Sequence, residues 1–145
     1  MSVGYSHILV PVDGSDASEH AAEHAIDLAN RYDAELTVMH VVDDDLLPLD
    51  ARSQQLVDRL EEEATDIVAE VVEWATEADV APVNEVVVRG SPAEQILATI
   101  EDGDGEVDLV VLGSHGRSGI DKFLMGSVSE RVVRQSPVPV LTVRS

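Results

Sequence analysis

The chain has 145 residues, of which 44% are hydrophobic, and its 29 acidic against 9 basic side chains give a formal net charge of −20. A chain of this length can bury roughly two-thirds of the surface that its unfolded state exposes, so one domain spanning residues 1–145 is expected. The absence of cysteine excludes disulfide frameworks, thiol catalysis and Cys-based metal sites. No apolar run reaches the ~20 residues of a membrane span, and residues 1–7 lack the features of a signal peptide, so we expect a soluble, cytoplasmic protein.

The acidic excess indicates a salt-rich environment. A charge of −20 repels itself strongly in dilute buffer, whereas in molar salt the Debye length falls to ~3 Å and screens that repulsion. We therefore expect an origin in a halophilic archaeon. Such a surface also disfavours nucleic acid and anionic membranes, whose binding depends on Lys and Arg. Residues 113–145 differ, with five basic and two acidic side chains, and a bound anion is expected there.

Short apolar runs alternate with helical patterns along the chain. Alanines at three- and four-residue spacing predict the first helix, which the turn cluster Asp13-Gly14-Ser15-Asp16 opens. Pro92 is typical of a first helical position, and Pro139 indicates that the last strand lies at a sheet edge. The expected strands cover 7–12, 35–42, 83–88, 107–112 and 138–143, and the expected helices cover 16–32, 52–79, 92–101 and 127–135, with an acidic loop at 43–50.

This alternation predicts an α/β fold with a doubly wound, parallel, five-stranded sheet, because right-handed crossovers place helices on both of its faces. The fourth strand is almost continuously apolar, as in strands buried on both faces. Ligands of such sheets bind outside the carboxyl ends of the strands, at the switch point of the topology. The expected site therefore includes Asp13-Gly14 and Gly113-Ser114.

The stretch from Gly113 to Ser129 carries the most functional information. Its glycines permit sharp turns and close approach of backbone N–H groups to a ligand, and the helix that begins near Ser127 presents its positive end. These features predict a phosphate cradle, with Arg117 and Lys122 inside it. The alternative is a long connection that uses glycine for turns, in which Ser127 caps the helix and Glu130 completes a capping box; both can hold together.

The spacing Gly-x2-Gly-x9-Gly-Ser, at Gly113, Gly116, Gly126 and Ser127, resembles the ATP-binding signature of the universal stress protein family. The similarity extends to most of the chain outside the acidic loop and the second helix. Its other segments are ILVPVDGS (8–15), HVV (40–42), VVVRGSPAEQI (86–96), DLVVLGSHGR (108–117) and SPVPVLTV (136–143). The resemblance implies the ATP-binding branch of the family and a Rossmann-like fold of the adenine nucleotide alpha hydrolase type.

Carried over residue by residue, the resemblance implies an adenine nucleotide site. The end of the first strand would line the nucleotide, the Val41 backbone would contact adenine, and the glycine loop and following helix start would hold ribose and phosphates. The implied binding residues are Pro11, Val12, Asp13, Val41, Gly113, Ser114, His115, Gly116, Arg117, Ser118, Gly119, Gly126, Ser127, Val128 and Ser129.

Asp13 is an unusual residue for a phosphate site, because a carboxylate repels phosphate. It is compatible with the site if it binds ribose hydroxyls or a Mg²⁺ (or Mn²⁺) ion that enters with ATP. Its alternative role is to cap the first helix.

Catalytic machinery is not evident. The sequence has no P-loop, no Gly-x-Ser-x-Gly elbow and no His-Glu-x-x-His motif, so ATP hydrolysis is expected to be slow at most. His20 and His24 are spaced to hold a metal but lack a third ligand, and His115, without a paired acid or nucleophile, is expected to donate a hydrogen bond rather than to act as a base.

The sequence is compatible with two functions: a nucleotide-dependent regulator or stress-response factor, and a structural or partner-binding stress protein that does not use nucleotide. The intact glycine loop favours the first. An acyl- or nucleotidyl-transferring enzyme would need a catalytic group that the sequence does not show. The apolar final strand predicts a homodimer that pairs through this edge, and the family resemblance implies the same.

Overall fold

The computed structural model describes residues 4–43, 54–102, 107–114 and 127–144. Strands and helices alternate along it as the sequence predicts, and the predicted bounds of the first and fourth helices match the observed ones. The elements are β1 (His7–Pro11), α1 (Asp16–Tyr32), β2 (Glu35–Asp43), α2 (Gln54–Glu77), β3 (Val83–Gly90), α3 (Pro92–Asp102), β4 (Leu109–Gly113), α4 (Ser127–Gln135) and β5 (Val140–Val143). In these ranges no helix is both long and apolar enough to cross a bilayer.

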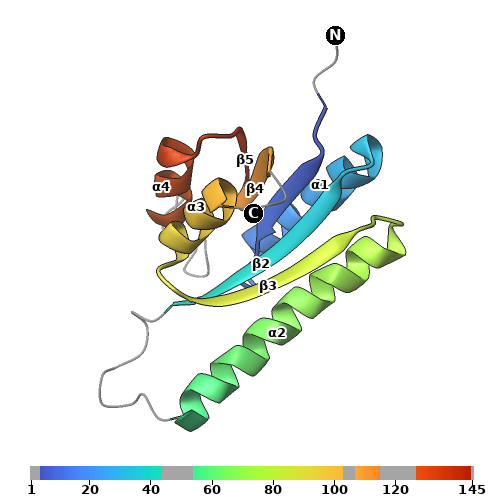
Figure 1. Cartoon of the computed structure of the whole chain (residues 1–145). Coiled ribbons are helices and arrows are strands. Elements are labelled where there is room, and N and C mark those ends of the chain that lie inside the picture. The colour runs from blue at the N-terminus through green and yellow to red at the C-terminus, as the bar shows by residue number, and fades with distance from the viewer. Residues whose placement is uncertain (1–3, 44–53, 103–106, 115–126, 145) are drawn as a thin grey trace.

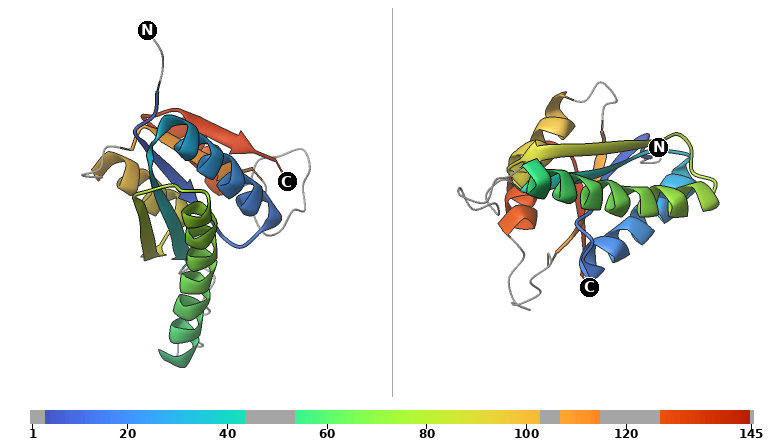
Figure 2. Two further views of the ribbon diagram at one scale, coloured as in Figure 1. Left: turned by 90° about the vertical axis from the view of Figure 1, so that its right-hand side faces the viewer. Right: turned by 90° about the horizontal axis from the view of Figure 1, so that it is seen from below.

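The five strands form one parallel sheet in the order β3-β2-β1-β4-β5, which confirms the doubly wound α/β prediction. Helices α1 and α2 cover one face of the sheet, and α3 and α4 cover the other (Figures 1 and 2). The neighbouring strands β1 and β4 are followed by helices on opposite faces. The switch point therefore lies between the carboxyl ends of β1 and β4.

Burial of the central strands explains their continuous apolar runs. Leu9 of β1 and Val110 of β4 are fully buried beneath α3 and α4, while Ile8 and Val111 are fully buried on the opposite face. The periodic alanines of α1 have almost no exposed surface, and their small side chains let this helix lie close to the sheet.

The final strand is an edge strand, as Pro139 predicts, but it begins at Val140 rather than at residue 138. Proline has no N–H to donate, so the ladder cannot extend regularly through it. The Pro139 carbonyl still accepts a hydrogen bond from Val110 N–H at 3.1 Å.

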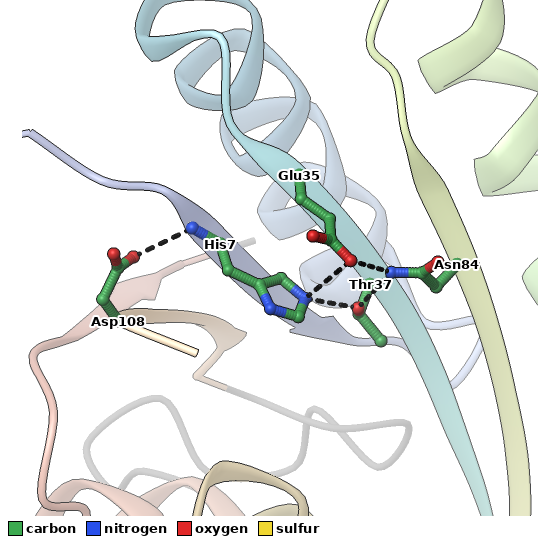
Figure 3. A network of polar contacts seen from close by, with 5 residues as sticks. All are labelled: His7, Glu35, Thr37, Asn84 and Asp108. Atoms are coloured by element: carbon green, nitrogen blue, oxygen red, sulfur yellow. Dashed lines mark hydrogen bonds and ion pairs between the residues drawn. The ribbon is translucent and has the colours of Figure 1, made fainter. Parts of the chain in front are cut away.

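Polar contacts join the strands at the amino-terminal edge of the sheet (Figure 3). His7 Nε2 lies 2.6 Å from Thr37 Oγ1, and Asn84 Nδ2 donates to Glu35 Oε2 at 2.6 Å. The Asp108 carboxylate accepts from His7 N–H at 3.2 Å. These contacts tie β1, β2 and β3 to the segment that enters β4, at the edge opposite the strands' carboxyl ends.

Candidate functional site

The structure places the described members of the predicted site at the carboxyl edge of the sheet and at the start of α4. These members are Pro11, Val12, Asp13, Val41, Gly113, Ser114, Ser127, Val128 and Ser129. The remaining predicted residues lie outside the described part of the chain. They are His115, Gly116, Arg117, Ser118, Gly119 and Gly126.

The loop after β1 is organised to start α1. Gly14 has a φ of 83°, a left-handed conformation that glycine adopts without strain. Ser15 is the N-cap of α1, and its side chain accepts a hydrogen bond from Ser18 N–H at 3.2 Å. Asp13 Oδ1 accepts from Ser15 N–H at 2.9 Å. Ser15 therefore caps α1, and Asp13 stabilises the position of Ser15 by accepting its N–H.

Gly113 brings the end of β4 against the first turn of α1. A Cβ atom at this position would lie 2.6 Å from the Ala17 carbonyl carbon and 2.8 Å from Ser18 N, and both atoms belong to the backbone. The φ of Gly113 is not positive, so at this position the glycine is needed for the space that it leaves to the α1 backbone. Ser18 Oγ in turn accepts from Asp13 N–H at 3.2 Å, which links the loop after β1 to the same contact.

The start of α4 is anchored to the end of β4. Ser129 is buried, and its hydroxyl donates to the Gly113 carbonyl at 2.8 Å. This bond brings the first turn of α4 to the switch point, with its positive dipole end and with N–H groups that have no partner within the helix. Ser127 is the first residue of α4, and the Glu130 carboxylate accepts a hydrogen bond from Arg134.

The sequence did not predict the environment of the Ser114 side chain. It is only 4% exposed, and within the described ranges its hydroxyl oxygen has no hydrogen-bond partner. Its N–H donates to the Val143 carbonyl at 2.9 Å, so the backbone is satisfied while the side chain is not. Leaving a buried hydroxyl unpaired costs about 1–3 kcal/mol. A polar ligand atom at this edge would remove that cost.

The end of β2 is joined to the loop after β1 by two hydrogen bonds that meet at Val12. Its N–H donates to the Met39 carbonyl at 2.7 Å, and its carbonyl accepts from His40 Nδ1 at 2.7 Å. Sequence reasoning did not assign a role to His40. The only signal was its place in the HVV segment shared with the family.

The described basic side chains of α4 lie close to acidic ones. Arg134 is engaged by Glu130, and Arg131 lies 3.7 Å from Glu94, so acids partly neutralise both. Arg117 and Lys122 lie outside the described residues. The described part of the site therefore offers N–H groups, hydroxyls and a helix terminus rather than cationic side chains.

A metal site is not preformed in this part of the chain. The described ranges contain no group of three or more His, Asp or Glu side chains that could hold an ion. His20 and His24 are exposed on α1, where His24 Nδ1 donates to the His20 carbonyl at 2.9 Å.

A cavity of about 500 Å³ lies elsewhere, between α1 and α2. Its lining includes two carboxylates, which would repel phosphate, so it does not compete with the carboxyl edge as an anion site. The lining residues are Glu23, Ile26, Asp27, Asn30, Trp74 and Ala78.

Comparison with known proteins agrees with this architecture. The model of the universal stress protein family matches residues 4–144. A universal stress protein of Methanocaldococcus jannaschii, MJ0531, is 36% identical over 143 residues, which cover 97% of this chain and 82% of that protein. The solved structure of the hypothetical protein MJ0577 superposes with a TM-score of 0.86 at 32% identity, covering 99% and 98% of the two chains. A universal stress protein solved in complex with cAMP gives a TM-score of 0.74 at 26% identity, covering 97% and 98%.

The family match spans nearly the whole chain, and the sheet order and switch point agree with the fold of these relatives. This chain belongs to the universal stress protein family.

Proposed function

We propose that this protein binds ATP at the carboxyl ends of β1 and β4 and acts as a nucleotide-dependent regulator or stress-response factor. The observation that carries the proposal is the buried Ser114 hydroxyl, which lacks a partner among the described residues beside the start of α4. In a structural or partner-binding stress protein that does not use nucleotide, this hydroxyl would keep the cost of being buried without a partner. The complex of a family member with cAMP supports an adenine nucleotide as the ligand class.

The chemistry of the site assigns a role to each part. The first-turn N–H groups of α4 and its positive dipole end would stabilise phosphate oxygens, and the Ser114 hydroxyl would bond to a phosphate or ribose oxygen. Residues 115–119 and Gly126 would complete the cradle, as the resemblance implies. Val41, at the end of β2, would present its backbone to adenine.

Asp13 is compatible with a Mg²⁺ ion that arrives with the nucleotide. Magnesium is commonly held by one or two carboxylates together with phosphate oxygens and water, so a single protein carboxylate is sufficient. When bound, the ion would neutralise phosphate charge beside Asp13. The chain itself contributes binding and orientation, and we propose that hydrolysis is slow at most.

The acidic composition supports a place in the cytoplasm of a halophilic archaeon, where concentrated salt screens the −20 charge. Binding should therefore be measured in molar potassium chloride.

The Ser114→Ala variant provides the direct test. We expect its affinity for ATP to fall about fivefold to tenfold, because a hydrogen bond to the ligand is lost. Its stability should stay equal or rise slightly, since the variant also removes a buried unpaired hydroxyl. Isothermal titration in molar salt and thermal unfolding measure the two effects.

Ser129→Ala is the control for the stability measurement only, because this buried hydroxyl does have a partner, the Gly113 carbonyl. It should lower stability by about 1 kcal/mol. Unchanged ATP affinity in Ser114→Ala would remove the main support for the site. If the wild-type protein bound no ATP in molar salt, the structural or partner-binding alternative would be favoured.

We further propose a homodimer that forms through the free edge of β5. Leu141 on this strand is 37% exposed, and no other strand of the described sheet covers that edge. Light scattering in molar salt should give twice the 15.6 kDa chain mass. Leu141→Lys should shift the protein to monomer, because it places a charge within the apolar contact.

Val87→Lys is the control for this prediction. Val87 is also 37% exposed, but it lies on β3, the opposite edge strand. Dissociation of both variants to the same extent would argue against β5 as the interface, and a monomeric wild type would argue against any dimer.

A further inference from the structure

The hydrogen bonds of β2 reveal which of its backbone groups face β1. Glu35 N–H donates to the Ser6 carbonyl at 2.9 Å, and the Met39 carbonyl accepts from Val12 N–H at 2.7 Å. In a parallel strand both polar groups of a residue point to the same side, and the side alternates along the chain. Val41 lies two residues beyond Met39. Its N–H and carbonyl therefore face the β1 side, beyond the point where β1 ends at Pro11.

A regular ladder would use the Val41 N–H within the sheet. A residue that donates to one residue of a parallel neighbour accepts from the residue two positions further along that neighbour. Val12 donates to Met39, so its carbonyl would ordinarily accept from Val41 N–H. In the described structure no such backbone bond joins Val41 to Val12.

The side chain of His40 donates to the Val12 carbonyl in place of the Val41 N–H. Its Nδ1 lies 2.7 Å from the Val12 carbonyl oxygen. A carbonyl oxygen can only accept, so Nδ1 carries the hydrogen and the opposite nitrogen, Nε2, is not needed for this bond. The Val12 carbonyl is thereby satisfied without Val41.

We propose that His40 is a positioning residue that reserves the Val41 backbone for the base of the nucleotide, an inference that rests on the proposed function. Adenine presents an acceptor, N1, beside a donor, the 6-amino group, which match a backbone N–H and carbonyl on the same side of a strand. Guanine and hypoxanthine present a donor at N1 and an acceptor at O6, the opposite pattern. His40 thus contributes to selection of adenine without touching it.

The state of the Val41 amide can be tested without nucleotide. In His40→Leu, Val41 N–H is expected to bond to the Val12 carbonyl, so its hydrogen exchange should slow by about fivefold to tenfold. In His40→Asn, the side-chain amide can replace Nδ1–H, and exchange should match the wild type. Asn and Leu have nearly the same shape, so the pair isolates the hydrogen bond. Equal exchange of Val41 in all three proteins would overturn the proposal.

A pair of ligands tests the consequence for binding. ATP and 1-deaza-ATP differ only in the replacement of adenine N1 by C–H. Wild type and His40→Asn should prefer ATP by about fivefold to tenfold, whereas in His40→Leu the ratio should approach one. If His40→Leu weakened both ligands equally, His40 would be merely structural. Failure of the wild type to bind ATP would count against the proposed function, while the exchange experiment would still decide the role of His40.

Discussion

Replacing Gly113 with alanine is expected to lower the free energy of unfolding by about 2–3 kcal/mol and to abolish ATP binding. The added Cβ would lie 2.6 Å from the Ala17 carbonyl carbon and 2.8 Å from the Ala17 oxygen, which are backbone atoms that cannot rotate away. Either α1 must move from the end of β4 or the strand end must shift, and overpacking of this kind is destabilising. Because the Gly113 carbonyl also anchors Ser129, the start of α4 would be displaced as well.

Denaturant unfolding and titration with ATP, both in molar salt, measure these two effects. Gly4→Ala is the control, because a Cβ there would meet only Tyr32 Cδ1 at an ordinary 3.9 Å. The control should retain both stability and binding. Native stability of Gly113→Ala would show that α1 and β4 do not pack as closely as the structure indicates.

Stability should also depend strongly on salt. We expect the thermal midpoint to rise by about 10 °C between dilute buffer and several molar potassium chloride, which corresponds to roughly 3 kcal/mol for a chain of this size. The physical reason is screening of repulsion among exposed carboxylates, since the chain has a net charge of −20. On α2, for example, Glu62, Glu63 and Glu70 are exposed.

The triple variant Glu62→Gln, Glu63→Gln, Glu70→Gln tests this cause. It keeps the shape of the surface while it removes three negative charges, so it should melt at a higher temperature in dilute buffer and gain less from added salt. A wild-type midpoint that does not change with salt would contradict both the repulsion and the halophilic origin. If wild type and variant had equal salt dependence, the effect would not arise from these charges.

Local signals explain why much of the fold could be predicted. The uninterrupted apolar run of β4 indicated a strand buried on both faces, and the alanine spacing of α1 indicated a helix close to the sheet. Pro92 and Pro139 marked a helix start and an edge strand. Each of these features depends on residues near one another in the chain, where periodicity and backbone restrictions act directly.

The position of the candidate site followed from the same reasoning, whereas its internal contacts did not. Once the strands are parallel, their carboxyl ends share one edge, so Asp13 and Gly113 had to lie near each other. That Gly113 makes room for the backbone of α1 could not be predicted, since the contact joins residues almost a hundred positions apart.

The sequence by itself determined the class of sheet, the family and the approximate bounds of the elements, and it predicted the edge at which the candidate site lies. Only the tertiary structure decided which polar groups there already form hydrogen bonds. Ser15 rather than Asp13 caps α1. The Ser129 hydroxyl donates to the Gly113 carbonyl, and the His40 side chain donates to the Val12 carbonyl. It also decided that the Ser114 hydroxyl is buried without a partner among the described residues. The physical reason is that hydrogen bonds between elements depend on distances of a few tenths of an ångström, which packing sets and residue spacing along the chain does not.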